Sequence, residues 1–155
     1  MVSIENFDNK FRKIGRTKEW KQLQEKFNEA EHIFLFGHGG NLGVADHAAI
    51  DMSRLTNKNV IAPGSGILAT SIISDESFET WLGKWLEIRT RGLDKSKCLA
   101  VGMSCSTTGD SSNSLVYGLN WAVDNGISSC LWSAQPKEGL NKKIIPISFD
   151  VINYH

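Results

Sequence analysis

The stretch Ile33-Phe34-Leu35-Phe36-Gly37-His38-Gly39-Gly40-Asn41-Leu42-Gly43 decides the fold. Its four consecutive apolar residues are typical of a strand buried on both faces, as in a parallel sheet. Glycines end this strand, and the residues after them show helical spacing of apolar positions: Val44, Ala45, Ala48, Ala49, Met52 and Leu55. The pattern predicts a strand, a glycine turn and a helix, the unit from which parallel α/β sheets are built.

The same alternation continues along the chain. Further strands are predicted at 60–62, 98–103, 129–132 and 144–149, and further helices at 17–30, around 78–86 and at 111–125. Strands that alternate with helices at this spacing are joined by right-handed crossovers. We therefore predict an α/β protein, a three-layer α/β/α sandwich with a five-stranded parallel sheet of the flavodoxin-like class. It forms one domain over 1–155, with an N-terminal helical segment at 1–30 and an α/β core at 31–150.

Composition and charge exclude several classes of protein. Of the 155 residues, 41% are hydrophobic and 22% are charged, which excludes disordered and collagen-like chains. Seventeen basic residues balance seventeen acidic ones, so no overall field favours a nucleic acid or an anionic membrane. No apolar run approaches the roughly 20 residues of a membrane span, and residues 1–30 lack a signal-peptide pattern. We expect a cytoplasmic protein whose three cysteines, Cys98, Cys105 and Cys130, are reduced and buried.

Ligands of such sheets bind beyond the carboxyl ends of the strands, so three turns are candidates: 37–43, 63–70 and 104–113. In the first turn, small residues let backbone amides surround an anion at a helix N-terminus. The alternative is that these glycines serve only the geometry of the turn. A dinucleotide site is excluded because GxGxxG would need glycine at Leu42. A P-loop is excluded because GK[ST] is missing. We expect no nucleotide cofactor.

The third turn, Ser104 to Asn113, places several hydroxyls beside Gly109 at a strand-to-helix junction. Hydroxyls and amides there can surround a phosphate without any lysine or arginine, which suits the neutral net charge. The alternative is a helix N-terminus capped by Asp110 or Ser111.

His47 and Asp51 stand four residues apart on the helix that follows the glycine turn, so they share one face. We expect them to point toward whatever the turn holds. Aldose–ketose isomerisation needs a base that moves a proton between adjacent carbons through an enediol, and a carboxylate near an imidazole or a metal supplies one. The alternative is an exposed pair worth a few tenths of a kcal/mol.

Taken in order, these segments resemble the sugar isomerase (SIS) domain, and within it the bacterial phosphoheptose isomerases, shortened at both ends. Residues 37–51 are similar to the family's GNGGS…HxAxE segment, 74–78 to its ND-x-x-F motif, and 106–113 to its STSGNSxN phosphate loop. The similarity spans about residues 33–135. Three motifs in register are more specific than any one of them.

The resemblance implies a set of sugar-phosphate contacts: Gly39, Gly40, Asn41, Asp75, Ser106, Thr107, Thr108 and Ser111. It also implies that Asp51 and His47 are catalytic, and that the same two residues hold a zinc ion in the members that bind one. Asp51 stands where the family has glutamate, one methylene longer, and an ångström-scale displacement can cost about a hundredfold in rate. The family's C-terminal helix, which carries a glutamine and a histidine of the active site, has no counterpart after Asp150.

Two functions follow from the resemblance. The first is an isomerase of carbohydrate metabolism that converts a sugar phosphate, such as sedoheptulose 7-phosphate, between aldose and ketose, with zinc as its candidate cofactor. The second is a non-catalytic sugar-phosphate-binding module, or a partner subunit of a full-length isomerase. Either is expected as a homodimer or homotetramer, with its sites near the subunit boundary.

Overall fold

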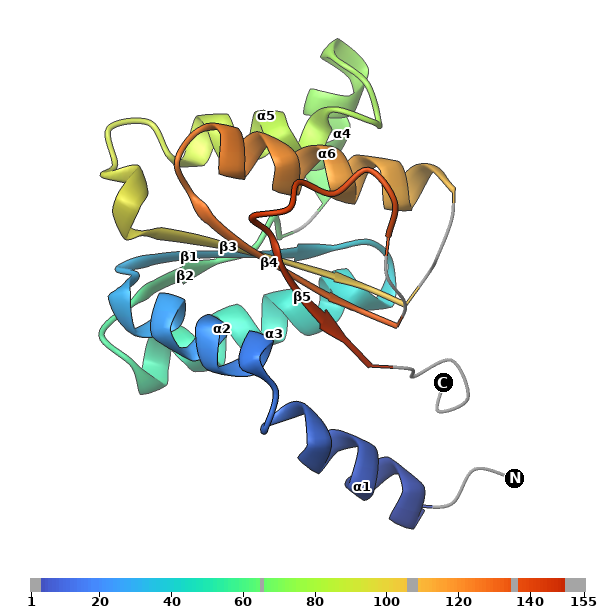
Figure 1. Ribbon diagram of the computed structural model, residues 1–155. Coiled ribbons are helices and arrows are strands. Elements are labelled where there is room, and N and C mark those ends of the chain that lie inside the picture. Colours follow the sequence, from blue (N-terminus) through green and yellow to red (C-terminus); the bar gives the residue numbers. More distant parts are fainter. Residues whose placement is uncertain (1–3, 65, 106–108, 135–136, 150–155) are drawn as a thin grey trace.

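The computed structural model describes residues 4–64, 66–105, 109–134 and 137–149 (Figure 1). Its strands are β1 (His32–Gly37), β2 (Asn59–Ile61), β3 (Cys98–Ser104), β4 (Ser128–Ser133) and β5 (Ile145–Ser148). Its α-helices are α1 (Ile4–Ile14), α2 (Lys18–Glu29), α3 (Gly40–Leu55), α4 (Gly66–Asp75), α5 (Trp81–Arg89) and α6 (Asp110–Asp124). A short 3₁₀ turn, Lys95–Lys97, precedes β3.

The five strands form one parallel sheet in the order β2-β1-β3-β4-β5, which confirms the predicted fold class. The strand order reverses between β1 and β3, because β2 lies on one side of β1 and all later strands lie on the other. Gly37 pairs with Met103 at the ends of these two strands. Ligands of open α/β sheets bind at such a reversal, so the carboxyl ends of β1 and β3 define the place to examine.

Helices cover both faces of the sheet, with α4, α5 and α6 on one face and α2 and α3 on the other (Figure 1). Successive side chains of a strand point to opposite faces, so the apolar run of β1 serves two cores. Phe34 and Phe36 pack with the fully buried Trp85 on one face, while Ile33 and Leu35 pack toward α3 on the other. The prediction of a strand buried on both faces is confirmed.

The turn predicted at 63–70 is wrong over its second half, because α4 begins at Gly66. Pro63 and Gly64 do end β2 as predicted, but the apolar residues that follow them continue as a helix rather than a loop. Ile72 of α4 is buried in the larger core. Packing against that core stabilises a helix whose start has no clear sequence signal, since most helical stability comes from tertiary packing.

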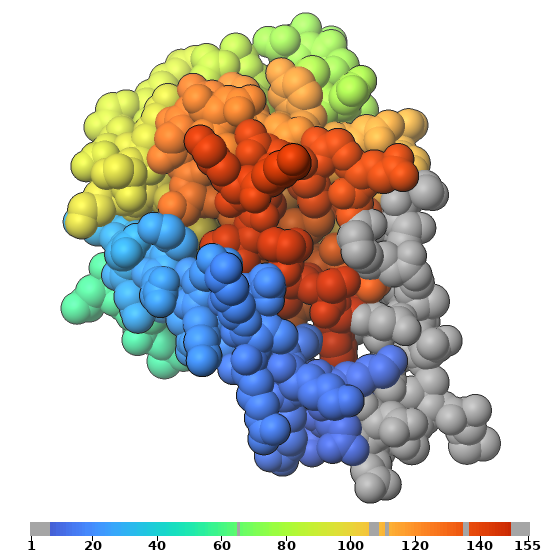
Figure 2. All heavy atoms as spheres, in the orientation of Figure 1, coloured from blue at the N-terminus to red at the C-terminus, as the bar shows by residue number. Residues whose placement is uncertain are grey.

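Helix α1 extends away from the sheet (Figure 1), within the N-terminal segment 1–30 that was predicted to be helical, although no separate helix was predicted before residue 17. Its Phe7 and Phe11 rings pack on Phe149, with ring centres 5.5 and 6.2 Å away. Figure 2 shows the face on which residues 137–149 lie between α2 and α6.

Among the described residues, no helix is long and apolar enough to cross a membrane.

The cysteines follow the prediction in part. Cys98 and Cys130 are buried and free, and burial raises the pKa of the Cys130 thiol to about 12. Cys105, at the carboxyl end of β3, is free but only half-buried. Of the three cysteines, Cys105 is the one at the sheet edge where a ligand is expected.

Candidate functional site

The carboxyl ends of β1 and β3 lie side by side, and we call the space beyond them the crevice, after the position at which open α/β sheets bind ligands. A close approach of two backbones shapes this edge. A Cβ atom on Gly37 would lie 2.8 Å from both the Cβ of Asn41 and the carbonyl oxygen of Met103. Only glycine lets the start of α3 come this near to β3. The approach places Asn41 over β3, where the Cys105 thiol donates to its Oδ1 over 3.6 Å.

Two helices begin at this crevice without a side-chain cap. The N-cap residue of α3 is Gly39, with a φ of 54°, and that of α6 is Gly109, with a φ of 93°. Among the residues that the structure describes, neither helix start has a side-chain cap hydrogen bond. The first amides of a helix lack intrahelical acceptors and carry the positive end of the helix dipole, so both starts suit an anion. The N-cap position of α6 is Gly109 and not Asp110 or Ser111, the predicted alternative.

Lys137, in the segment after β4, brings a positive charge to the same place. Its side chain is 9% exposed, and its ammonium donates a hydrogen bond to the Ser112 hydroxyl in the first turn of α6 over 2.8 Å. Burial lowers the pKa of Lys137. The sequence analysis named only hydroxyls and amides for this turn and did not foresee a lysine beside it. The signal was present in the sequence, because Lys137 follows the predicted strand 129–132 and the carboxyl end of every strand reaches this edge.

His38 is the second residue that the sequence analysis missed, although the glycine turn contains it. It follows β1 directly and its ring packs against two aromatic rings, Phe78 at 5.2 Å and Trp81 at 5.8 Å between centres. The indole N–H of Trp81 donates to His38 Nε2 over 3.3 Å. Burial lowers the pKa of His38 below its ordinary value of 6.5, so the imidazole is neutral at pH 7.

The predicted sugar-phosphate contacts are placed unevenly. Gly39, Gly40 and Asn41 line the start of α3, as expected from the motif. Asp75 is the exposed last residue of α4, three residues before the Phe78 ring that contacts His38. Ser106, Thr107 and Thr108 lie outside the described residues. Ser111 lies in the first turn of α6, and its side chain is likewise outside the description.

His47 and Asp51 contact each other, as the spacing predicts, with 3.2 Å between Nε2 and Oδ2. Their side chains are 83% and 47% exposed. With Gly40 and Gly43 they line an open hollow of about 610 Å³ along α3. Asp51 stands ten residues beyond Asn41, which is about 15 Å along a helix. The pair therefore shares a hollow with the glycine turn but lies well away from the crevice at the strand ends.

A zinc ion is not accommodated by these two residues alone. Within the described part of the chain, no three residues among His, Cys, Asp and Glu are grouped so that they could hold a metal. Catalytic zinc ions have three protein ligands and a water, whereas His47 and Asp51 offer two exposed donors. The zinc prediction stays a prediction, and it needs a third ligand from elsewhere.

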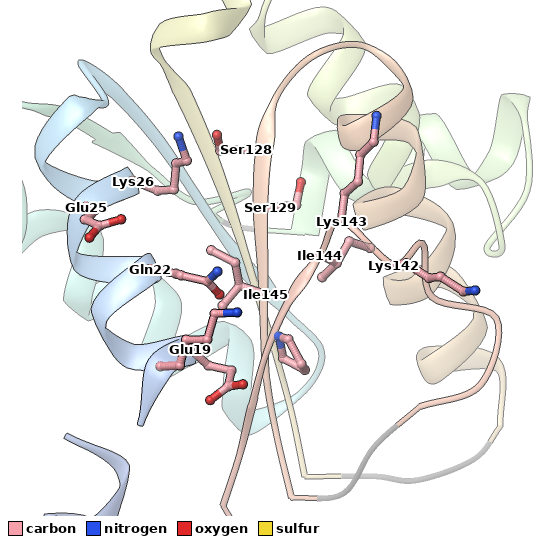
Figure 3. A pocket seen from close by; sticks show the side chains of 12 residues that line it. Glu19, Gln22, Glu25, Lys26, Ser128, Ser129, Lys142, Lys143, Ile144 and Ile145 are labelled. Atoms are coloured by element: carbon pink, nitrogen blue, oxygen red, sulfur yellow. The ribbon is translucent and has the colours of Figure 1, made fainter. Parts of the chain in front are cut away.

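A separate hollow of about 540 Å³ lies between α2 and the starts of β4 and β5. Figure 3 shows its lining, which includes Gln22 and Lys26 from α2 and Ser128 and Ile145 from the two strands. These strand residues are at the amino ends of the sheet, opposite to the crevice. The helix N-termini of α3 and α6 do not reach this side, so the hollow is not the candidate site.

Comparison with known proteins supports the fold. No protein-family model matches the sequence, and no curated protein is similar to it in sequence. Among solved structures, the chain is similar to phosphoheptose isomerase GmhA from Neisseria gonorrhoeae. The two share 20% identity with a TM-score of 0.61, over 94% of this chain and 82% of that chain. The chain thus has the fold of a phosphoheptose isomerase, as the sequence motifs implied.

Proposed function

We propose that this chain binds a sugar phosphate in the crevice at the carboxyl ends of β1 and β3. The observation that carries the proposal is the pair of uncapped helix starts, at Gly39 and Gly109, on neighbouring strands at the reversal of strand order. Lys137 adds a buried cation at the second of them. A phosphate of two negative charges is matched by amides, hydroxyls and this one ammonium. The fold shared with phosphoheptose isomerase GmhA supports this ligand class.

The proposed reaction is aldose–ketose isomerisation of a sugar phosphate such as sedoheptulose 7-phosphate. A base removes the proton from the hydroxyl-bearing carbon beside the carbonyl, and an enediol forms between the two carbons. Asn41 and Asp75 are the proposed contacts of the sugar hydroxyls, and Ser106, Thr107, Thr108 and Ser111 those of the phosphate. Asp51 is the proposed base, with His47 beside it at 3.2 Å. Zinc remains a candidate cofactor at this pair if a further ligand joins it.

A second copy of the chain is part of this proposal. Because both side chains are exposed and Asp51 lies about 15 Å along α3 from Asn41, we infer that one chain does not deliver the pair to its own crevice. An apolar hollow of about 540 Å³ beside them, lined by residues such as Phe27, Met52 and Trp132, supports self-association. We propose a homodimer or homotetramer in the cytoplasm, with the pair of one protomer near the crevice of its partner.

A non-catalytic sugar-phosphate-binding module is the second candidate function. The exposure of Asp51 favours it, because a general base is usually held by its surroundings in a fixed position. In that case the crevice retains the phosphate contacts and lacks a working base. If the chain is instead a partner subunit of a full-length isomerase, we expect the same features: the phosphate contacts are retained and a working base is lacking.

The experiment that separates these functions combines ligand-induced thermal stabilisation with isotope exchange. Sedoheptulose 7-phosphate and fructose 6-phosphate are expected to raise the melting temperature of the wild type, and Ser106→Ala with Thr108→Ala to abolish the shift. Ser96→Ala, at the opposite end of β3, is the control and keeps it. An isomerase also exchanges the proton of the carbon beside the carbonyl with solvent deuterium, and Asp51→Asn stops this exchange without changing the thermal shift.

The outcomes are distinct. Stabilisation without exchange, with and without added zinc, contradicts the isomerase and leaves the binding module. No stabilisation by any of the hexose or heptose phosphates contradicts both functions.

A further inference from the structure

His38 lies at the reversal of strand order, directly after β1 and beside the start of α3. Its backbone carbonyl accepts a hydrogen bond from the amide of Asn41 over 3.1 Å, which fixes the turn that carries the imidazole. Aromatic rings from the α4–α5 connection and from α5 pack against the imidazole. The ring therefore sits in a defined place at the edge of the crevice.

The contact with Trp81 fixes which ring nitrogen carries the proton. The indole N–H only donates hydrogen bonds, so His38 Nε2 must be an acceptor and cannot carry hydrogen. In the neutral ring the proton then lies on Nδ1. Trp81 is 2% exposed at the first position of α5 and has no freedom to turn its N–H elsewhere. Protonation of Nε2 would place two donors against each other across 3.3 Å.

His38 Nδ1 has no hydrogen-bond partner among the described residues. A donor on a half-buried neutral ring, held in one orientation and lacking an acceptor, suits an oxygen atom of a bound molecule. We infer that His38 donates a hydrogen bond from Nδ1 to the oxygen of the substrate on which negative charge develops. This inference rests on the proposed function and extends it, since it adds an electrophilic catalytic residue that the sequence motifs did not supply.

His38 keeps its proton throughout the chemical step, because the protons that move belong to the substrate. When the base takes the proton from the carbon beside the carbonyl, the C–H electron pair becomes the second bond between the two carbons. The carbonyl π pair moves to its oxygen, and the Nδ1–H dipole stabilises the charge there. The proton of the neighbouring hydroxyl then passes to this oxygen. The π pair between the two carbons takes the first proton back from the base onto the former carbonyl carbon, while the electron pair of the former O–H bond closes the new carbonyl. A neutral imidazole suits this task, because it stays a donor of fixed orientation throughout the step.

Nuclear magnetic resonance of the full chain with ¹⁵N-labelled histidine rings tests the tautomer directly. At pH 7 the His38 ring, identified by its loss in His38→Asn, is expected to show hydrogen on Nδ1 and a lone pair on Nε2. Trp81→Phe keeps an aromatic ring but removes the N–H, so the His38 ring is expected to become a mixture of tautomers. Hydrogen on Nε2 or on both nitrogens in the wild type overturns the inference, whatever the chain does with sugar phosphates.

Kinetics of sedoheptulose 7-phosphate isomerisation tests the role. The amide nitrogen of His38→Asn lies near the place of Nδ1, while His38→Leu has no donor. We expect kcat to fall about a hundredfold in His38→Leu, the usual loss of one oxyanion donor, and to be partly restored in His38→Asn. His32→Asn, at the opposite end of the same strand, is the control. Wild-type kcat in His38→Leu overturns the inference and leaves the proposed function intact, whereas an inactive wild type contradicts isomerisation and removes the reaction on which the inference rests.

Discussion

The ammonium of Lys137 donates a hydrogen bond to the hydroxyl of Ser112 over 2.8 Å, from the segment after β4 to the first turn of α6. The lysine is buried, although buried lysines are rare in proteins. The contact joins residues 25 positions apart because parallel strands bring all their carboxyl ends to one edge. A chain with no net charge thus holds a localised positive charge at the helix start proposed to bind the phosphate.

Replacement of Lys137 is expected to weaken sugar-phosphate binding. Lys137→Met keeps the apolar stem and removes the charge, and a hydrogen bond to a charged group contributes about 1.5–3 kcal/mol, so the dissociation constant should rise about 10- to 100-fold. Isothermal titration calorimetry with sedoheptulose 7-phosphate measures it. Lys142→Met, an exposed lysine of the same segment, is the matched control. Equal affinity of Lys137→Met and wild type would show that the ammonium does not contact the phosphate.

Alkylation should distinguish the three cysteines. Burial raises the pKa of the Cys130 thiol to about 12 and also raises that of Cys98, so folding lowers the fraction of thiolate at both cysteines. Half-buried Cys105 is expected to react first with iodoacetamide, as read by peptide mass spectrometry. Because its thiol contacts Asn41 in the crevice, a bound sugar phosphate should slow the reaction. Labelling of Cys130 before Cys105 would contradict the burial described for β3 and β4.

The stability of the protein should depend on His38 at acidic pH. The pKa of His38 is lowered in the folded state from 6.5, so between the two values the unfolded chain binds more protons than the folded one. Stability due to this group rises as the pH increases through the window below 6.5 and is constant above it. Urea unfolding at a series of pH values is expected to show a smaller acid dependence in His38→Asn. His32→Asn serves as the control, and an unchanged acid dependence in His38→Asn would be the contrary result.

The contact between α5 and α6 should not tolerate a methyl group at Gly118. A Cβ atom there would lie 2.9 Å from the Cβ of Leu82, and overpacking of this kind costs about 1–3 kcal/mol. Gly43→Ala provides the opposite case, because no atom of the described residues lies within 4 Å of the position that its Cβ would take in α3. Alanine there should stabilise the helix by up to about 1 kcal/mol. Chemical denaturation measures both, and equal effects of the two substitutions would contradict the close packing of α5 on α6.

Removal of one buried hydroxyl should leave the stability unchanged or increase it. Ser114 is fully buried in α6, and its Oγ has no hydrogen-bond partner in the described part of the chain. Ser114→Ala removes an unsatisfied group that costs about 1–3 kcal/mol when buried. Ser129→Ala is the matched comparison, since the buried Ser129 hydroxyl donates to the carbonyl of Ile127 over 3.2 Å. Thermal melts should place Ser114→Ala at or above wild type and Ser129→Ala below it; the reverse order would mean that Ser114 has a partner.

The fold was predictable from local patterns because they coincide with how the chain packs. The run 33–36 is apolar at every position since β1 contributes to two cores, and the glycines after it mark its end. Helix α4 was not predictable in the same way. It begins two residues after the Pro63–Gly64 break and is stabilised by burial of Ile72, which no local signal announces.

The candidate site was predictable only where its residues belong to one motif. The spacing of His47 and Asp51 determined that they meet, but the distance of this pair from the crevice depends on how α3 lies on the sheet. Asn41 and Cys105 are 64 positions apart and touch because β1 and β3 are neighbours. Trp81 looks like a core residue in the sequence, and it is one, yet its N–H also determines the tautomer of His38.

The sequence by itself therefore determined the α/β class, the succession of the five strands and the helices that connect them other than α4, because hydrophobic spacing and glycine positions act over a few residues. The tertiary structure alone decided that Lys137 reaches Ser112 and that Trp81 reaches His38. Those contacts join segments that are distant along the chain, and only the order of strands in the sheet brings their ends together.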